Sequence, residues 1–268
     1  LFRLFNKFAC LYGKSNNSDF VNAGFPEPQI VGGKDAPIGK FPYQVSLRKG
    51  GNHFCGGSII DSRWILTAAH CVRNENNPKA ITVHTATNLL SSAGDSYTPD
   101  KIIANRKFNM LTLTDDVALI RVDRNIVFND LVQTIPLAKG SNTYEGSSCT
   151  LTGWGTLRVS ANGNLPNKLQ YIDLLVETQA KCKKVHIQVK DSHICTFTKY
   201  GEGACNGDSG GPLVSNGVQI GIVSFGRPCG IGYPDIIFRK IFIKRISITM
   251  SHHVEVAMVV ARMPKQKT

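Results

Sequence analysis

Several common classes of protein are excluded by what this 268-residue sequence lacks. It has no Cys-x-x-Cys pair and no cluster of Cys and His at metal-ligand spacing, which argues against a structural zinc site. Its late apolar stretch, residues 246–260, is too short to cross a bilayer and is broken by His and Glu. Helical periodicity is scarce, and there is no tandem repeat. We therefore expect no zinc module, transmembrane helix or repeat protein.

Positive charge is plentiful but unevenly placed. The chain has 31 Lys and Arg against 19 Asp and Glu, a formal net charge of +12. Residues 237–268 alone have a net charge of +6, whereas residues 30–236 have +5. A strongly basic chain suggests a nucleic-acid or membrane partner, but no nucleic-acid motif accompanies these residues. We expect no nucleic-acid and no membrane partner, and polyanion binding is the weakest functional hypothesis.

Short β-type runs separated by Gly, Asn and Ser turn signals begin at residue 30, and this spacing is typical of an all-β sandwich or barrel. The basic run of Lys181, Lys183 and Lys184 is expected to be a solvated turn. The expected strands are residues 43–47, 58–60, 64–66, 80–83, 117–122, 149–152, 169–176, 219–225 and 236–238.

Eight cysteines are spread singly through the chain. This spacing suits disulfide partners, which would place the protein in an oxidising compartment. On the count alone, buried free thiols remain the alternative.

Three strings bring together the residue types of nucleophilic catalysis. A serine hydroxyl needs an imidazole to take its proton, and the imidazole needs a carboxylate to orient it. His70, Asp116 and Ser209 supply these groups, at separations of 46 and 93 residues. Glycines around the serine allow a tight turn that aims two N–H groups at one point, as an oxyanion site requires. The strings are Thr67-Ala68-Ala69-His70-Cys71, Asp115-Asp116-Val117-Ala118-Leu119-Ile120 and Gly207-Asp208-Ser209-Gly210-Gly211-Pro212.

These strings resemble the trypsin/chymotrypsin family of secreted serine proteases, and the pattern is most similar to arthropod chymotrypsin-like enzymes. The resemblance covers residues 30–239 and implies two packed six-stranded antiparallel β-barrels with the active site between them. A C-terminal helix is doubtful, because residues 241–268 show no clear helical face. Four further strings carry the resemblance: Ile30-Val31-Gly32-Gly33, Phe54-Cys55-Gly56-Gly57-Ser58, Gly153-Trp154-Gly155 and Ser224-Phe225-Gly226.

The resemblance also implies a domain organisation. Residues 1–29 would be a leader or propeptide with an incomplete N-terminus, and residues 30–240 would be the serine protease domain. Its first barrel would span about 30–133 and its second about 134–240. Residues 241–268 would form an atypical basic tail.

By the resemblance, His70 is the general base and acid, Asp116 orients it, and Ser209 attacks the scissile carbonyl. The backbone N–H groups of Gly207 and Ser209 form the oxyanion hole. Ile30 matches the residue that becomes the new N-terminus when such zymogens are cut, and its ammonium would pair with Asp208.

One departure concerns activation. Gln29 stands where trypsin-activated relatives have Arg or Lys. Either another protease activates the chain, or residues 1–29 are not its true leader.

The resemblance implies three disulfides, Cys55–Cys71, Cys182–Cys195 and Cys205–Cys229. Cys149 matches a position whose usual partner would fall at Ser215, so it looks unpaired, and a bond between Cys149 and Cys10 is the open alternative.

Substrate preference follows from the expected pocket. Gly203 stands where trypsin-like enzymes carry Asp, and Gly226 leaves the pocket mouth open, which together predict cleavage after Phe, Tyr or Leu. Residues Ser224, Phe225 and Gly226 would pair with the substrate backbone as an extended strand. Asp235 either lies on the pocket wall and admits Lys or Arg, or faces solvent.

The leading hypothesis is a secreted, extracellular, monomeric serine endopeptidase made as a zymogen. Its expected partners are protein or peptide substrates, an activating protease and protein protease inhibitors. We expect no cofactor and no metal ion, because the acidic residues between 74 and 100 are too sparse for calcium. The alternative is a catalytically silent, protease-like binding protein, which the intact triad disfavours and the atypical tail favours.

Overall fold

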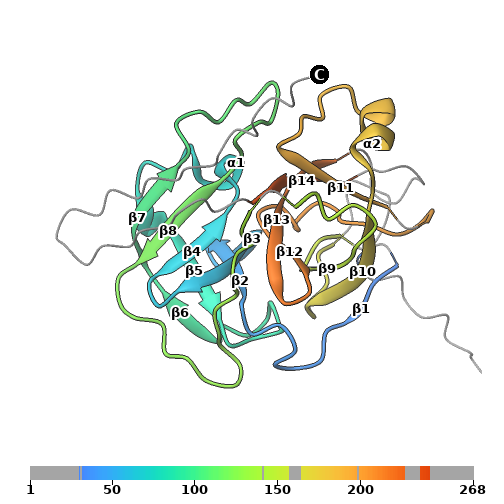
Figure 1. Cartoon of the computed structure of the whole chain (residues 1–268). Coiled ribbons are helices and arrows are strands. Elements are labelled where there is room, and N and C mark those ends of the chain that lie inside the picture. The colour runs from blue at the N-terminus through green and yellow to red at the C-terminus, as the bar shows by residue number, and fades with distance from the viewer. Residues whose placement is uncertain are drawn as a thin grey trace, which may run out of the picture.

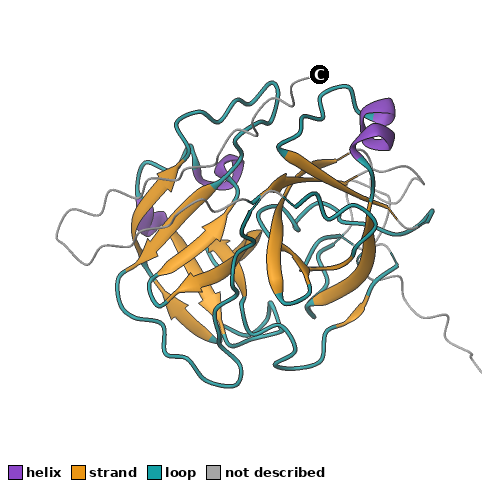
Figure 2. Cartoon of the chain, in the orientation of Figure 1, coloured by secondary structure: helices purple, strands orange, loops and turns teal. Residues whose placement is uncertain are grey.

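The computed structural model describes residue 30 and residues 32–140, 142–156, 164–197, 199–226 and 236–241. This part of the chain is built mainly from antiparallel strands in two sheets that lie side by side (Figure 1; Figure 2). Its short helices are α1 (Ala69–Val72), the 3₁₀ helix η1 (Pro78–Ala80) and α2 (Gln179–Val185). Among the described helices, none has the length and apolar character that crossing a membrane requires. The all-β prediction is confirmed.

The first sheet has the strand order β6-β5-β2-β3-β4-β8-β7. Its edge strands β6 and β7 follow one another along the chain and are separated by Thr98, so residues 95–104 change partners at Pro99, which has no N–H to donate. Counted as one bent strand, this segment makes the sheet six-stranded. The strands are β2 (Gln44–Lys49), β3 (Asn52–Asp61), β4 (Trp64–Thr67), β5 (Ile81–Thr85), β6 (Asp95–Tyr97), β7 (Pro99–Ala104) and β8 (Ala118–Val122).

The second sheet closes on itself. Six strands follow the order β10-β11-β14-β13-β12-β9, and β9 pairs again with β10, while β1 adds to the outer side of β10. Closure leaves fewer exposed strand edges. The strands are β1 (Lys34–Asp35), β9 (Ser148–Gly153), β10 (Gln170–Val176), β11 (His193–Phe197), β12 (Pro212–Ser215), β13 (Val218–Gly226) and β14 (Ile236–Lys240).

The start of the described chain belongs with the second sheet rather than the first. Lys34 pairs with Tyr171 of β10, and the fully buried Ile30 packs in the hydrophobic core of the second sheet. The expected first barrel at about 30–133 is therefore wrong at its beginning, because strand pairing across the molecule overrides proximity along the chain. Each sheet has its own core, and a third apolar cluster, which includes Leu66, Leu119 and Ile222, joins residues of both sheets.

Each expected strand overlaps a strand of the structure, but the basic run at 181–184 was misassigned. It lies in α2, where Thr178 caps the helix by accepting from Lys181 N at 3.3 Å. The three lysines are exposed, as predicted, but they lie in a helix and not in a turn. At the other end, the buried Ile241 donates its N–H to Ile220 O at 3.0 Å, so ordered packing continues to residue 241.

Two buried side-chain hydrogen bonds join the sheets. Ser58 of β3 donates to Gln219 of β13 at 2.6 Å, and Thr152 of β9 donates to Gln44 of β2 at 2.6 Å. Buried polar groups are costly when unpaired, so these bonds disfavour sliding of one sheet along the other. This junction sets the position of the groups described below.

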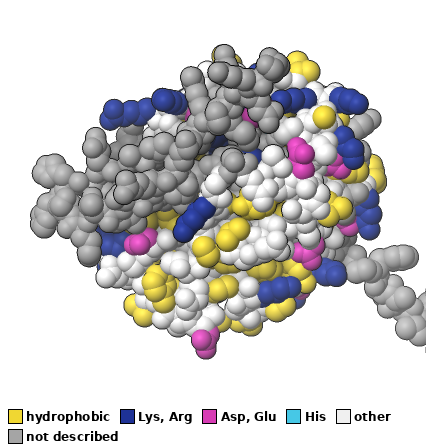
Figure 3. Space-filling model, viewed as in Figure 1, with side chains coloured by type: hydrophobic (Ala, Val, Ile, Leu, Met, Phe, Trp, Pro, Cys, Tyr) yellow, Lys and Arg dark blue, Asp and Glu magenta, His cyan; other side chains and the backbone are white. Residues whose placement is uncertain are grey.

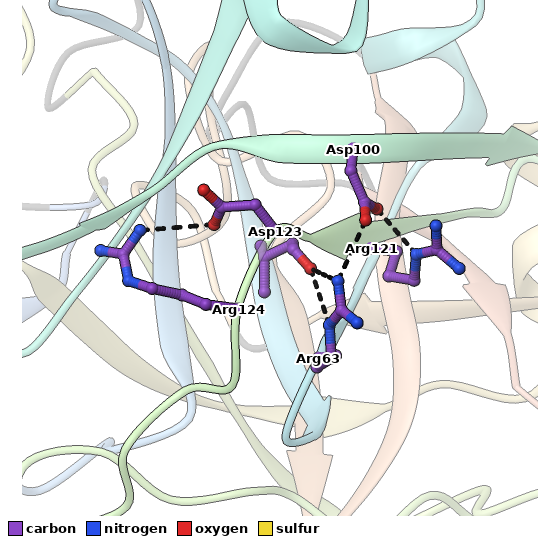
Figure 4. Close-up of polar contacts among 6 residues, drawn as sticks. Arg63, Asp100, Arg121, Asp123 and Arg124 are labelled. Atoms are coloured by element: carbon purple, nitrogen blue, oxygen red, sulfur yellow. Dashed lines mark hydrogen bonds and ion pairs between the residues drawn. The ribbon is translucent and has the colours of Figure 1, made fainter. Parts of the chain in front are cut away.

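Charges on the described surface form local pairs. On the face shown in Figure 3, Lys and Arg side chains are spread in small groups among Asp and Glu. Among the described ion pairs, Asp100 of β7 accepts from Arg63 at 3.0 Å and from Arg121 of β8 at 2.7 Å (Figure 4). Exposed pairs of this kind contribute little to stability individually.

Candidate active site

His70 is presented by the short helix α1, which follows directly from β4. The chain leaves β4 at Thr67, and Ala68 has the extended conformation of a helix N-cap. The His70 side chain is 20% exposed, and α1 lies near the boundary between the sheets (Figure 1). The imidazole is therefore held by packing on one side and open to solvent on the other.

Asp116 holds this imidazole in a defined orientation. The carboxylate is fully buried at the end of the loop before β8. One oxygen accepts from His70 N at 2.8 Å, and the other lies 2.7 Å from His70 Nδ1. Contact with an ionised carboxylate assigns the proton to Nδ1 and leaves Nε2 as the acceptor.

Ser224 supplies a further hydrogen bond to Asp116, which the sequence did not reveal. Its hydroxyl donates to Asp116 Oδ2 at 2.5 Å, from the second sheet to the first. The pairing of β13 with β14 shifts register between Val223 and Phe225, so Ser224 is the extra residue of a β-bulge. Bulges redirect side chains, and here the bulge accounts for a strand residue that faces the other sheet.

Ser209 lies in a turn that only glycines permit. Gly210 has a φ of +79°, and a Cβ there would collide with the Thr67 hydroxyl and Gly56 O. Gly56 N donates to Ser209 O at 2.8 Å, and Gly210 N donates to Val223 O at 2.9 Å. The turn is thereby attached to both sheets.

The hydroxyl of Ser209 and the imidazole of His70 are not hydrogen-bonded in the described structure. His70 Nε2 lies 3.6 Å from Cys71 Sγ. Catalytic hydrogen bonds are often long or poorly aligned without substrate, so this geometry does not exclude the pair. Cys55, His70 and Cys71 also form the one cluster among the described residues dense enough for a metal ion, but the two cysteines are joined in a disulfide.

Two backbone N–H groups near Ser209 have no acceptor among the described residues, those of Gly207 and Ser209. The carbonyls of the same peptide groups are occupied. Asn206 O accepts from Thr156 N at 2.8 Å, and Asp208 O accepts from a backbone N–H three residues further on at 2.9 Å. A trans peptide directs its N–H away from its C=O. These contacts therefore orient two donors suited to a developing oxyanion.

His53 fixes the next peptide of this turn. Its Nε2 lies 2.9 Å from Gly207 O, and its Nδ1 lies 2.8 Å from Ser46 Oγ. Burial lowers the pKa of His53 to about 4, so the ring is neutral at physiological pH. The sequence offered no signal for this contact, because 154 residues separate His53 from Gly207.

Asp208 is fully buried beneath the same turn. Its carboxylate accepts from Gly155 N at 2.7 Å and from Cys205 N at 2.8 Å. A Cβ on Gly153 or Gly155 would collide with this carboxylate, which explains the glycines on both sides of Trp154. Burial raises the pKa of Asp208 to about 6. Ile30 is a chain-internal residue here, so its nitrogen is an amide rather than an ammonium, and Asp208 has no ion pair among the described residues.

The expected pocket residues are only partly described. Gly203 is buried with a φ of +148°, and Phe225 packs against the Cys182–Cys195 disulfide and the ring of His193. Gly226 is exposed at the end of β13. Asp235 lies outside the described residues.

Two expected disulfides are present in the described chain, Cys55–Cys71 and Cys182–Cys195. Cys205 is disulfide-bonded, and its expected partner, Cys229, lies outside the described residues. Cys149 is a buried free thiol that donates to Leu174 O at 3.4 Å, and burial raises its pKa to about 12. Cys10 also lies outside the described residues.

Comparisons with known proteins agree with this geometry. The family description "Trypsin" matches residues 30–245. The chain is 50% identical over 210 residues to chymotrypsin-2 of Vespa crabro, covering 78% of this chain and 94% of that protein. It is 35% identical to trypsin delta of Drosophila melanogaster, covering 78% and 83%. Among solved structures it is similar to neuropsin, a serine protease expressed in the limbic system of mouse brain, with a TM-score of 0.72, 30% identity and coverage of 78% and 93%.

Proposed function

The chain belongs to the trypsin family of serine proteases and is a serine endopeptidase, and from this premise we propose that Ser209, His70 and Asp116 carry its chemistry. Ser209 Oγ attacks the scissile carbonyl while its proton passes to His70 Nε2. The imidazolium then protonates the leaving amine, and an acyl-enzyme remains. Water repeats the sequence, with His70 again as the base, and releases the acid product and the free Ser209 hydroxyl.

The single observation that carries this proposal is the set of contacts around Asp116. A buried carboxylate that accepts from His70 N and lies against Nδ1 fixes both the tautomer and the ring position. It also stabilises the imidazolium that forms during attack. The N–H groups of Gly207 and Ser209, which have no acceptor among the described residues, would donate to the negatively charged oxygen of the tetrahedral intermediate.

We propose that cleavage before Ile30 activates the enzyme. The new ammonium would pair with Asp208, whose pKa is raised by burial and which has no ion pair among the described residues. Ile30 is already buried beside the second sheet, so the required movement concerns the main-chain nitrogen more than the side chain. Because Gln29 precedes Ile30, the activating protease would have to cleave after Gln, unless the natural leader differs from residues 1–29.

The proposed preference is for large apolar and aromatic residues before the cut bond, with Ser224, Phe225 and Gly226 pairing with the substrate backbone. Gly203 places no carboxylate at the position that carries Asp in trypsin-like relatives. Asp235 would broaden the preference to Lys and Arg if it lies on the pocket wall.

The proposed setting is extracellular. Disulfides persist in oxidising compartments, and the described chain has two complete ones. We propose a secreted monomer with a folded unit over residues 30–240, whose partners are protein or peptide substrates, an activating protease and protein inhibitors.

A catalytically silent binding protein is the second candidate. The observation that favours it is the lack of a hydrogen bond between His70 Nε2 and the Ser209 hydroxyl in the described structure. Substrate binding would have to align the two groups for the first candidate to hold.

The test uses chain cut before Ile30 and matched peptides that end in Phe, Leu or Arg at the cut bond. The endopeptidase predicts turnover of the Phe and Leu peptides and none with Ser209→Ala. Appreciable Arg cleavage would show that Asp235 takes part in recognition. Lack of turnover in both proteins, with correct disulfides and a cooperative unfolding transition, would favour the binding protein.

A further inference from the structure

An ion pair joins the second sheet to the loop that carries Asp116. Arg239 of β14 donates from Nη2 to Asp115 Oδ1 at 3.0 Å, and its side chain is only 3% exposed. Its Nη1 also donates to Ser192 O at 3.2 Å. A guanidinium buried this deeply requires partners in defined positions, so Arg239 couples the position of β14 to that of the Asp115 backbone.

The same loop has an unusual backbone on the N-terminal side of Asp116. Leu113 has a φ of +50° and Asp115 a φ of +58°. Left-handed conformations are uncommon for residues other than glycine and persist when surrounding contacts hold them. The orientation of the Asp116 carboxylate depends on this backbone, because Asp116 follows Asp115 directly.

A second contact from the same sheet holds Leu113. His193 of β11 accepts from Lys190 N at Nδ1, at 3.0 Å, which leaves the proton on Nε2. That nitrogen lies 3.3 Å from Leu113 O and donates to it. Burial lowers the pKa of His193 to about 4, so this donor stays neutral at physiological pH.

Arg239 also contributes a positive charge beside the two neighbouring carboxylates of Asp115 and Asp116. Asp115 and Asp116 are adjacent carboxylates, and their like charges repel one another. Among the described residues, the charged and titratable groups that interact with these two include His70 on α1, His193 on β11 and Arg239 on β14. Arg239 is the permanent cation of this set, and its charge interacts with both carboxylates.

We propose that Arg239 is a positioning residue for the His70–Asp116 pair and acts through its ion pair with Asp115. The inference rests on the catalytic role proposed above for that pair. Arg239 touches neither substrate nor reacting atoms in this scheme. It holds the left-handed backbone at Asp115 so that the Asp116 carboxylate stays against His70 Nδ1.

The kinetic test compares Arg239→Gln, Arg239→Lys and a matched control, Arg121→Gln, in chain cut before Ile30. Arg121 also pairs with an aspartate (Figure 4) and lies on β8, which follows Asp116, but its side chain is partly exposed. Misplacement of a catalytic group by about 1 Å can lower a rate about 100-fold. We expect Arg239→Gln to lower kcat per titrated active site about 10- to 100-fold, with KM changed by less than about two-fold. Arg239→Lys should recover most of the loss, and Arg121→Gln should match wild type.

Asp115 provides a second pair of variants, in which the Arg239 side chain itself is kept. Asp115→Gly removes the ion pair yet accepts the left-handed backbone, whereas Asp115→Asn keeps an acceptor oxygen and tolerates that backbone. We expect Asp115→Gly to resemble Arg239→Gln. Asp115→Asn loses the charge but keeps an acceptor oxygen for Arg239, so its kcat should lie between those of Asp115→Gly and wild type. If Arg239→Gln fails to fold, the comparison of Asp115→Gly with Asp115→Asn still tests whether the contact between Arg239 and Asp115 supports catalysis.

A readout without turnover separates this inference from the proposed function. The His70 Nδ1 proton lies against Asp116 and should give a resonance far downfield in the proton NMR spectrum. It should weaken or move upfield in Arg239→Gln and Asp115→Gly and persist in Arg239→Lys and Arg121→Gln. No turnover by the wild-type chain would contradict the proposed function. An unchanged resonance, or a kcat within about two-fold of wild type, in a folded Asp115→Gly variant would overturn the positioning role.

Discussion

Asp116 and Asp208 are both fully buried carboxylates near the junction of the sheets, but the protein holds them differently. Asp116 accepts from side chains as well as backbone, since His70 and Ser224 both reach it. Asp208 accepts from two backbone N–H groups, and glycines make the space around it. One carboxylate is built into a side-chain network, and the other lies in a backbone cradle.

The comparison shows that two equally buried carboxylates can have different roles when their hydrogen-bond partners differ. The Asp116 carboxylate, held by the Ser224 hydroxyl, orients the imidazole of His70. Asp208 lacks an ion-pair partner among the described residues, and burial raises its pKa to about 6. A group left in this condition responds strongly to a new cation, and the proposed Ile30 ammonium would be that cation.

Asp116→Asn should have the largest effect. The amide nitrogen would donate to His70 Nδ1, so the ring proton would move to Nε2, where it could not accept the Ser209 proton. We expect kcat to fall about 10⁴-fold. Peptide turnover in chain cut before Ile30 measures this. A loss of less than about 10-fold, with the fold intact by circular dichroism, would contradict the assigned role.

Asp208→Asn should change stability rather than catalytic chemistry in the uncut chain. Asp208 has a raised pKa of about 6 in the folded chain against 3.8 for an ordinary Asp. Between these pH values the folded state keeps a proton that the unfolded state releases, so the free energy of unfolding falls as the pH rises. Ionisation of the buried carboxylate therefore lowers the free energy of unfolding by about 3 kcal/mol, and this loss is complete above about pH 6.

Urea unfolding of uncut wild type and Asp208→Asn from pH 4 to pH 8 measures this contribution. Because Asn has no carboxyl to ionise, the variant should lack the fall, and its stability relative to wild type should increase with pH. After cleavage before Ile30, the same variant should lose activity, since an amide cannot pair with the ammonium. A difference between the two proteins that is independent of pH would contradict the account of Asp208.

Gly155→Ala should disturb the backbone cradle. The added methyl would meet the Asp208 carboxylate, which two hydrogen bonds prevent from moving freely. We expect a destabilisation of about 2 kcal/mol, as for other overpacked sites. The double variant with Asp208→Ala should recover part of it, because the carboxylate is gone. Strictly additive effects in urea unfolding would show that the methyl does not meet Asp208.

Ser224→Ala should have the smallest effect of the four. It removes one charge-assisted hydrogen bond to Asp116 and leaves His70 in place. A hydrogen bond to a charged group contributes about 2 kcal/mol, and we expect kcat to fall about 10-fold. Ser215→Ala is the matched control, because this buried serine donates to a neutral carbonyl, Ser148 O. Equal kcat values for the two variants would show that the hydrogen bond from Ser224 to Asp116 does not contribute to catalysis.

Much of the fold and site followed from local strings. Turn signals and short apolar runs predicted an all-β chain, and the strings around His70, Asp116 and Ser209 predicted which side chains to bring together. The contacts that were missed join residues far apart in sequence. Ser224 and Asp116 are 108 residues apart, and Asp115 and Arg239 are 124 residues apart. No periodicity or spacing marks such pairs, because strand register and the β-bulge on β13 bring them into contact.

The charged residues give a second example of contacts that the sequence does not predict. Composition counts the charges but does not place them, whereas in the structure Arg63 and Arg121 share Asp100 and Arg239 pairs with Asp115. These pairs leave the formal net charge of +12 unchanged, because that figure already counts the aspartates.

The sequence by itself determined the chemical groups of the candidate site and the turn around Ser209, since side-chain type and glycine conformation act over a few residues. Tertiary structure alone decided which donors surround Asp116 and Asp208, and that the start of the described chain lies with the second sheet. The physical reason is that hydrogen-bond partners of buried groups are chosen by the packing of the two sheets. That packing depends on contacts between residues more than a hundred positions apart, as between β13 and the Asp116 loop.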